Sequence, residues 1–273
     1  MVPAIGPPMG KVLDGTFPVS VDAEAAAWAN TVANNGGAVS SARFALVRRL
    51  LYRWDEAGIR HLVDHANAWW GEDEVQARVG LRSLLVATAV NSPTFAANVG
   101  VTGNGTTSYY DTGFIPATHG RAITGGFHHI GAQVLTNVSG TMSVMGAGGG
   151  ATTRLRPRTA ANVVGVQIEA AFGSFVDSVT DSTGYISAQR AGTSTIQGRK
   201  DDTALTDLTV GTLNTNLPTG PTFVLARNNN GTPAEYYTGQ AGFTYECAPL
   251  TSAQWSAMRA SILEFGQGVG AIA

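Results

Sequence analysis

The sequence predicts a mainly β protein, in which an antiparallel sandwich follows an N-terminal helical part and precedes one C-terminal helix. Three observations lead to this fold class. Charged residues concentrate early, since positions 22–82 hold 15 of the 36 formal charges. Threonine, which favours strands, concentrates later, with 26 of 30 residues between positions 91 and 250. Clusters of Gly, Asn, Asp and Pro recur in that second region and mark turns between short strands.

The first 20 residues are predicted to form an extended arm. Positions 1–18 contain four Pro and three Gly. Such a stretch lacks the apolar period of a helix and favours an extended backbone. Two interpretations stay open, namely a disordered tail and a docking arm that orders on a neighbouring subunit.

Residues 21–90 are predicted to form a helical subdomain for attachment and oligomerisation. Apolar residues spaced three and four positions apart indicate three short helices. The second begins at Ser40 or Ser41 and stops at Gly58, and the third ends at Gly71. The three apolar stripes are Val21, Ala25, Trp28 and Val32, then Phe44, Val47, Leu51 and Trp54, then Ile59, Leu62, Val63, Ala66 and Trp69 or Trp70.

These helices also predict an oligomer. A helical set of this length is marginal alone, and its four Trp need partners that cover them. Exposed Trp patches commonly mark interfaces. We therefore expect a homo-oligomer, with a trimer favoured, joined through residues 21–90.

Residues 91–250 are predicted to form the sandwich. Asn104-Gly105 is a strong signal for a two-residue hairpin. Residues 146–150 predict a flexible hairpin tip. The strand-like runs between turn signals are Ala122–Ile130, Thr141–Met145, Val163–Ala171, Gly184–Arg190, Thr222–Ala226 and Ala241–Glu246.

Residues 251–273 are predicted to form the C-terminal helix and tail. Thr251 and Gln254 make a capping box, in which each residue satisfies a backbone group of the other. The apolar residues that follow are spaced three or four apart, and Gly266 is a plausible end of the helix. They are Trp255, Met258, Ile262 and Phe265.

The composition excludes several classes of partner. A net charge of -2 argues against a general nucleic-acid binder. No apolar run approaches the ~18 residues of a membrane span, and the N-terminus lacks the apolar segment of a signal peptide. The single cysteine, Cys247, cannot form an internal disulfide and is expected to be a small buried side chain. We expect assembly in a reducing cytoplasm without membrane insertion.

No pattern of acids predicts an enzyme. A glycosidase on this fold needs closely spaced acids on one strand, of the form Glu-x-Asp-x-x-Glu, and the sequence lacks it. Asp201 and Asp202 are adjacent, but neighbouring strand residues point to opposite faces. We therefore predict that the protein is not an enzyme and has no catalytic residues.

Histidine spacing does not predict a metal site or a cofactor either. His61 and His65 lie one helical turn apart on the predicted third helix, but no third ligand accompanies them. His128 and His129 are neighbours in a strand, so their rings should point to opposite faces. No metal and no cofactor are expected.

Sugar binding needs exposed aromatic rings and polar groups. All five Trp lie in helical parts, where core or interface positions are expected. In the β part, adjacent Tyr236 and Tyr237 must place one ring on each face. The candidate glycan-binding residues are Arg227, Asn229 and Tyr237, on a turn-rich edge formed by residues 199–202 and 227–237.

A second basic feature is the alternation of Arg154, Arg156 and Arg158, which puts three guanidinium groups on one strand face. Pro157 favours an edge strand. Three interpretations stay open: an exposed inert edge, a contact between subunits, and a clamp for an acidic sugar.

Several stretches together resemble a known family. They are NSPTFAANVGVTGNGTTSYYDTGFIPATHG from Asn91, GYISAQRAGTSTIQGRKDD from Gly184, and the closing Leu250-Thr251 that leads into an amphipathic helix. This succession resembles structural proteins of tailed phages and gene transfer agents, in which a concanavalin A-like (LamG-like) jelly roll follows a short helical region. The resemblance covers roughly residues 40–265. The Pro-rich N-terminus and the charged stretch 72–82 depart from it.

The resemblance implies a virion surface component of the fibre, spike or receptor-binding type. Its implied partners are other virion proteins, reached through the N-terminal arm, and a host-surface polysaccharide. The leading hypothesis is a non-enzymatic virion structural protein that binds host glycan. The alternatives are a glycan-degrading enzyme on the same jelly roll and an architectural capsid or tail protein without a ligand.

Overall fold

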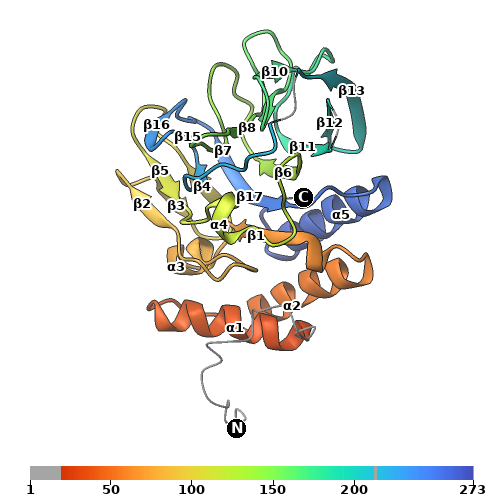
Figure 1. The fold of residues 1–273 in the computed structure, drawn as a ribbon. Coiled ribbons are helices and arrows are strands. Elements are labelled where there is room, and N and C mark those ends of the chain that lie inside the picture. Colours follow the sequence, from red (N-terminus) through yellow and green to blue (C-terminus); the bar gives the residue numbers. More distant parts are fainter. Residues whose placement is uncertain (1–19, 193, 212–213, 273) are drawn as a thin grey trace.

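The structure is a computed structural model that describes residues 20–192, 194–211 and 214–272. It is mainly β, as predicted, with two antiparallel sheets packed face to face and helices on one outer side (Figure 1). The predicted arm over residues 1–20 lies outside the described residues except for Ser20. That side chain caps the first helix by accepting a hydrogen bond from the Ala23 N–H at 3.2 Å.

The larger sheet has eight strands. Its path runs β13-β12-β11-β6-β17-β4-β3, and β1 pairs with the other end of the same β17 edge as β4. The bounds are β1 Val63–Ala68, β3 Thr94–Ala96, β4 Gly100–Thr102, β6 Phe127–Val134, β11 Gly184–Ala191, β12 Thr195–Lys200, β13 Thr203–Thr209 and β17 Gln240–Cys247.

The smaller sheet has seven strands in the order β10-β9-β8-β7-β14-β5-β2. A separate hairpin, β15 with β16, accompanies it. The bounds are β2 Thr88–Val90, β5 Tyr109–Asp111, β7 Met145–Ala147, β8 Thr153–Arg156, β9 Gly165–Ile168, β10 Gly173–Ser174, β14 Phe223–Val224, β15 Arg227–Asn229 and β16 Thr232–Ala234.

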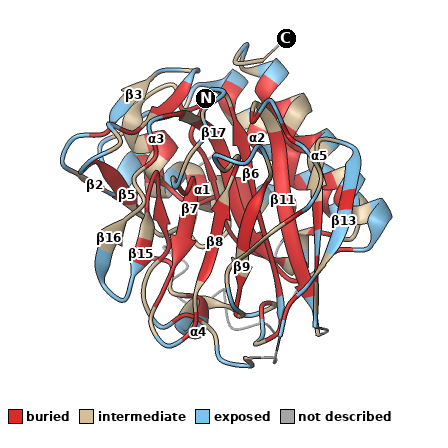
Figure 2. Ribbon diagram, turned by 90° about the horizontal axis from the view of Figure 1, so that it is seen from above, coloured by how far each residue is buried: buried red, intermediate tan, exposed pale blue. Residues whose placement is uncertain are grey.

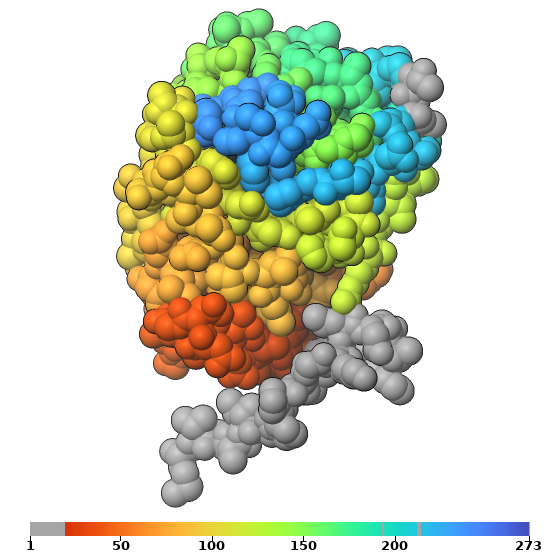
Figure 3. All heavy atoms as spheres, turned by 60° about the vertical axis from the view of Figure 1, so that its left-hand side comes forward, coloured from red at the N-terminus to blue at the C-terminus, as the bar shows by residue number. Residues whose placement is uncertain are grey.

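Helices α1, α2 and α5 cover the outer face of the larger sheet. Helices α1 and α2 form one end of the molecule, red and orange in Figure 3, and α5 lies beside the sheet (Figure 1). The bounds are α1 Val21–Asn34, α2 Ser41–Glu56, η1 Arg60–Leu62, α3 Glu74–Arg78, α4 Pro116–His119 and α5 Ser252–Gly268.

The larger sheet is therefore a middle layer with apolar packing on both faces, which Figure 2 shows as red strands. On β6, Ile130 and Val134 face the smaller sheet. On β17, Phe243 and Tyr245 pack among the helices. This alternation follows from the period of two along a strand.

Close packing of helix layer and sheet requires glycine at one point. Gly242 on β17 lies under the indole of Trp70, and a Cβ there would approach Trp70 Cε2 to 2.1 Å. All five Trp side chains are at most 3% exposed. Their assignment to the core is confirmed, and they form no exposed patch that would call for a partner subunit.

Two of the three helices predicted for the N-terminal part are confirmed. Helices α1 and α2 form over the predicted stripes, and the Ser40 side chain caps α2 at the Arg43 N–H. The third predicted helix, Ile59 to Trp70, is wrong, because only η1 is helical and Val63–Ala68 is the buried strand β1. The capping box at Thr251 is confirmed, and α5 continues past Gly266 to Gly268.

The predicted hairpin at Asn104-Gly105 is wrong. The strands on either side, β4 and β5, belong to different sheets, so the segment crosses the sandwich. Asn104 Oδ1 accepts from the backbone N–H groups of Thr106, Thr107 and Ser108 at 2.8–3.0 Å. This local turn satisfies the backbone without pairing the flanking strands.

Candidate functional site

The structure separates the three residues predicted to bind glycan. Asn229 is exposed on the β15–β16 hairpin, whereas Arg227 is half-buried. Tyr237 is only 1% exposed and packs between the two sheets. The placement of Tyr237 on the surface is therefore wrong. Its neighbour Tyr236 is partly buried and packs near Tyr109, and both tyrosines lie in the loop between β16 and β17 rather than in a strand.

The predicted binding edge does not form as one surface. Residues 199–202 join β12 to β13, and residues 227–237 contain the β15–β16 hairpin. The two segments lie on opposite sides of the molecule in Figures 1 and 2. The two segments therefore cannot form one binding surface.

Arg227 belongs to an arginine cluster, defined as Arg154, Arg156 and Arg227 around Glu235. Arg154 and Arg156 form ion pairs with the Glu235 carboxylate, and Arg227 Nε lies 3.4 Å from Glu235 Oε1. Burial opposes ionisation of Glu235, but hydrogen bonds from Arg156 and Ser143 bring its pKa below the usual range. Burial lowers the pKa of Arg154 to about 10.

The cluster corrects the edge prediction for Arg154 and Arg156. Their strand β8 pairs with β7 on one side and β9 on the other, so it lies inside the sheet. The guanidinium carbons of Arg154 and Arg156 lie 4.0 and 4.4 Å from the centre of the Phe172 ring. Arg158 instead donates to Thr180 O at 2.6 Å. The cluster holds the hairpin onto the smaller sheet.

Within the segment 199–202, Arg199 lines a surface groove. This groove of about 450 Å³ lies between the N-terminus of α5 and strands β11, β12 and β13. We call it the α5 groove and define it by the lining residues Gln197, Arg199, Leu205, Asp207, Ser252 and Trp255. Its volume falls in the range of ~300–1,000 Å³ typical of ligand sites.

The back of the α5 groove is built rigidly. The Arg199 guanidinium carbon lies 4.9 Å from the centre of the Trp255 ring, and its Nη1 donates to Ser256 Oγ at 3.0 Å. Gln189 ties the groove floor to the start of α5, because its amide donates to Gln197 Oε1 and Leu250 O at 3.0 Å each. These contacts fix the positions of the polar groups before any ligand arrives.

Polar groups at the rim of the α5 groove are accessible. Gln197, Asp207 and Ser252 are exposed, and the structure shows no hydrogen bond or ion pair between the Asp207 carboxylate and any described residue. Leu205 and Trp255 beneath them are buried, Leu205 in the core between the sheets and Trp255 in the core under the helices. Sequence reasoning reached Arg199 through its turn, but Gln197 and Asp207 carry no signal, since α5 alone turns their strands into a groove.

The two adjacent histidines point to opposite faces of β6, as predicted. His128 lies between the sheets, where Nδ1 is 3.0 Å from Glu169 Oε1 and Nε2 is 2.9 Å from Glu246 Oε2. His129 lies under α5, and its Nε2 is 2.9 Å from Tyr245 Oη. Burial lowers the pKa of His129 to about 3.

The His128 site is closed. Burial disfavours its charge, but hydrogen bonds to Glu169 and Glu246 raise the pKa of His128 to about 9. The side chains of all three residues are at most 1% exposed. Glu169 also accepts from the Gly126 N–H at 2.5 Å, and Thr222 donates to Glu246. These two carboxylates are brought together, but no sugar can reach them.

The described residues contain no group of three His, Cys, Asp or Glu side chains that could hold a metal ion. The predicted helical spacing of His61 and His65 does not form, since His61 is exposed in η1 and His65 is buried in β1. Cys247 is buried as expected, and burial raises the pKa of its thiol well above the usual value. Within the described ranges, no helix is long and apolar enough to span a membrane.

Comparison with protein-family models and with curated proteins found no match. Among solved structures, the chain is similar to domain 4 of AbnA, a GH43 extracellular arabinanase from Geobacillus stearothermophilus, solved with arabinotriose. The TM-score is 0.51, with 8% identity over 72% of this chain and 98% of that domain. The chain is also similar to the CBM40 domain of Ruminococcus gnavus IT-sialidase bound to alpha2,3 sialyllactose, with a TM-score of 0.42 and 11% identity over 63% and 96% of the two chains.

The NanB sialidase of Streptococcus pneumoniae is similar with a TM-score of 0.38 and 11% identity over 50% of this chain. The match covers 24% of NanB, so this chain corresponds to about a quarter of that protein. Together with the two packed sheets, the likeness to domain 4 of AbnA identifies the fold as an antiparallel β-sandwich of the jelly-roll type.

Proposed function

We propose that this protein is a non-enzymatic, carbohydrate-binding structural component of a virion surface, and that the α5 groove holds a host-surface polysaccharide. The observation that carries the proposal is the α5 groove itself. It combines exposed amide, carboxylate and hydroxyl groups with the partly buried guanidinium of Arg199.

Such a lining suits a sugar. The hydroxyls of a sugar need both hydrogen-bond donors and acceptors. Gln197, Ser252 and Arg199 can donate, and Asp207 can accept. One cation and one anion among these residues favour a neutral glycan. Domain 4 of AbnA, which shares the fold, was solved with arabinotriose.

Binding without hydrolysis fits the arrangement of acids. A glycosidase needs two carboxyl groups on either side of an accessible glycosidic bond. Glu169 and Glu246 are near each other but are sealed in the core on His128. In the α5 groove, Asp207 is the lining carboxylate. The groove therefore has the groups for recognition and lacks a pair for proton transfer.

The virion assignment draws on the resemblance of residues 40–265 to structural proteins of tailed phages and gene transfer agents. In this proposal the arm over residues 1–20 docks on other virion proteins, and the chain forms a homo-oligomer, with a trimer favoured. A host-surface polysaccharide is the external partner. Assembly takes place in the host cytoplasm.

The α5 groove is tested by Asp207→Asn. We expect this change to weaken binding to host-surface polysaccharide at least tenfold, because the acceptor for a sugar hydroxyl becomes a weaker one. The melting temperature should stay unchanged, since Asp207 is exposed. Binding is measured by isothermal titration with purified polysaccharide fragments.

Asn229→Ala is the matched control, because it removes an exposed amide from the hairpin that the sequence pointed to. We expect it to leave polysaccharide binding unchanged. Full binding by Asp207→Asn together with weakened binding by Asn229→Ala would move the site to the hairpin. Absence of polysaccharide binding by the unaltered protein would reject the carbohydrate function.

Oligomer formation is tested by light scattering at tens of micromolar, a range in which a standard-size interface holds. We expect the full chain to have the mass of three copies.

Deleting residues 1–19 should leave the melting temperature unchanged and prevent incorporation into particles. A monodisperse monomer contradicts the trimer, and normal incorporation of the shortened chain contradicts the docking role of the arm.

A further inference from the structure

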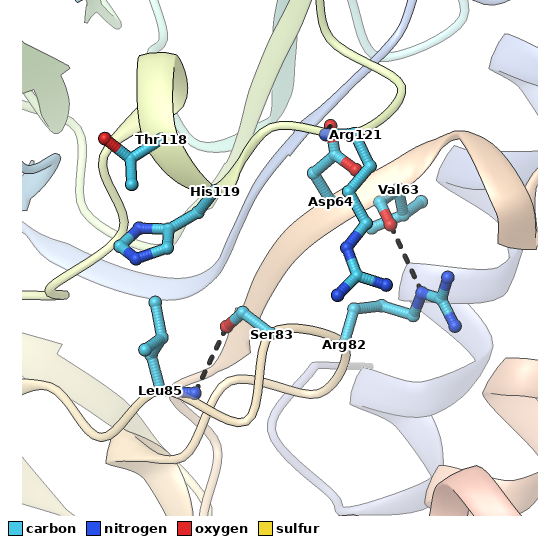
Figure 4. A pocket seen from close by; sticks show the side chains of 8 residues that line it. All are labelled: Val63, Asp64, Arg82, Ser83, Leu85, Thr118, His119 and Arg121. Atoms are coloured by element: carbon cyan, nitrogen blue, oxygen red, sulfur yellow. Dashed lines mark hydrogen bonds between the residues drawn. The ribbon is translucent and has the colours of Figure 1, made fainter. Parts of the chain in front are cut away.

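A second hollow lies where β1 begins. Its lining residues are distant in the sequence from those of the α5 groove. Its volume is about 190 Å³, and it is bounded by the turn at residues 81–85 and by α4 (Figure 4). Its polar lining residues are Asp64, Arg82, Ser83, Thr118, His119 and Arg121. None of these residues lines the α5 groove.

Arg121 is held in place through its backbone. The Asp64 carboxylate accepts hydrogen bonds from the N–H groups of Arg121, Ala122 and Ile123 at 3.0, 3.0 and 2.8 Å. Three donors on one carboxylate fix residues 121–123 against β1. These donors engage both Asp64 oxygens, and the structure shows no ion pair between Asp64 and the Arg121 guanidinium.

The positive charge of Arg121 has no ion-pair partner among the residues that the structure describes. The Arg82 guanidinium is occupied, since it pairs with Glu24 and donates to Val63 O at 3.2 Å. The Arg121 side chain is exposed, and its guanidinium has no hydrogen bond or ion pair with any residue that the structure describes. Figure 4 shows this group directed toward Ser83 and Arg82. A free guanidinium held on a fixed backbone is suited to an oxyanion.

His119 adds a donor of known position. Its Nδ1 accepts the Ile115 N–H at 2.9 Å, so the neutral ring carries its proton on Nε2. On the other wall, Ser83 Oγ lies 2.8 Å from His65 Nδ1 and accepts the Leu85 N–H at 3.3 Å. Both side chains are thus held by hydrogen bonds within the protein. His119 and Ser83 are therefore positioned before a ligand arrives, whereas Arg121 is held through its backbone.

We propose that this hollow binds an oxyanion group, a carboxylate, sulfate or phosphate carried by a small ligand. Arg121 supplies the charge and a two-pronged donor, and the His119 Nε2–H supplies a second direction. The ligand class differs from that of the α5 groove, for which a neutral glycan is expected. The two sites are therefore independent in residues and in chemistry.

The experiment is a titration of the full chain, followed by NMR of the histidine side chains and by calorimetry. The probes are inorganic phosphate, sulfate and glucuronate, with glucose as the uncharged counterpart of glucuronate and chloride to match ionic strength. We expect saturable binding of at least one oxyanion and a shift of the His119 ring signals. Arg121→Ala should reduce that affinity at least tenfold.

Arg121→Ala keeps the backbone N–H that Asp64 binds, so the fold should be retained, and an unchanged melting temperature verifies this. Arg48→Ala is the control, because it removes a surface arginine that only pairs with Asp22 and stacks on Tyr52. It should leave oxyanion binding unchanged. No saturable binding of any oxyanion, equal affinity in Arg121→Ala, or an equal loss in both variants would overturn the proposal.

Discussion

Replacing His128 with Leu is expected to lower the free energy of unfolding at pH 7 by about 3–5 kcal/mol, the range for breaking a buried ion pair. The imidazolium lies between Glu169 and Glu246 at 3.0 and 2.9 Å, and its removal leaves two carboxylates uncompensated in the core. Urea denaturation followed by circular dichroism measures the loss. His61→Leu, at an exposed histidine, should change stability by less than about 0.5 kcal/mol.

The same site predicts a dependence on pH. The pKa of His128 is about 9 in the folded protein and ~6.5 in the unfolded chain. The folded state therefore binds the proton more tightly, and this stabilisation is complete below pH ~6.5 and lost as the pH rises through about 9. The unaltered protein should lose stability between these values, and His128→Leu should lack that component. An equal loss in both proteins would contradict the assignment.

Replacing Trp54 with Ala should cost about 3–5 kcal/mol of stability, as for other large buried aromatic residues. The side chain is fully buried, its Nε1 donates to Ser261 Oγ at 2.9 Å, and its ring packs edge-on against Phe243 of β17 at 6.4 Å. One residue thus joins α2, α5 and the larger sheet. Urea denaturation is again the measurement.

Tyr52→Ala is the control on the same helix. Tyr52 is 41% exposed and contacts Arg48, so its loss should cost less than about 1 kcal/mol. Because the helices and the sheet share one apolar core, fluorescence and circular dichroism should report a single transition for Trp54→Ala. Two separate transitions, or a cost as small as that of Tyr52→Ala, would show that the helices fold apart from the sandwich.

The sequence predicts the elements whose signals are local. Helices α1, α2 and α5 have amphipathic spacing together with side-chain caps, and both cause the helix directly. Strand β1 was missed because both of its faces are buried. Its polar residues, Asp64, His65 and Asn67, are buried rather than on a solvent face, a bulge interrupts its period of two, and its apolar residues happen to fit a helical spacing.

The candidate site could be predicted only in part, for a similar reason. A period of two assumes that Tyr236 and Tyr237 are strand residues, but both lie in the loop between β16 and β17, and the period would not say which ring is inside. The α5 groove joins β12 and β13 to a helix that begins more than 40 residues later, at Ser252. No local pattern reports that approach. Arg199 was reached because it borders a turn, whereas Asp207 was not.

The position of β17 has a consequence for how the chain folds. It pairs with β6 on one side and with β1 and β4 on the other, yet it is the last strand of the described sequence. Before residue 247 leaves the ribosome, β1 and β4 lack their partner strand β17. One edge of β6 is then also unpaired. Completion of the larger sheet is therefore delayed until β17 has been synthesised, and the waiting segments are exposed to aggregation. The larger sheet is complete only after β17 has paired with β6, β1 and β4.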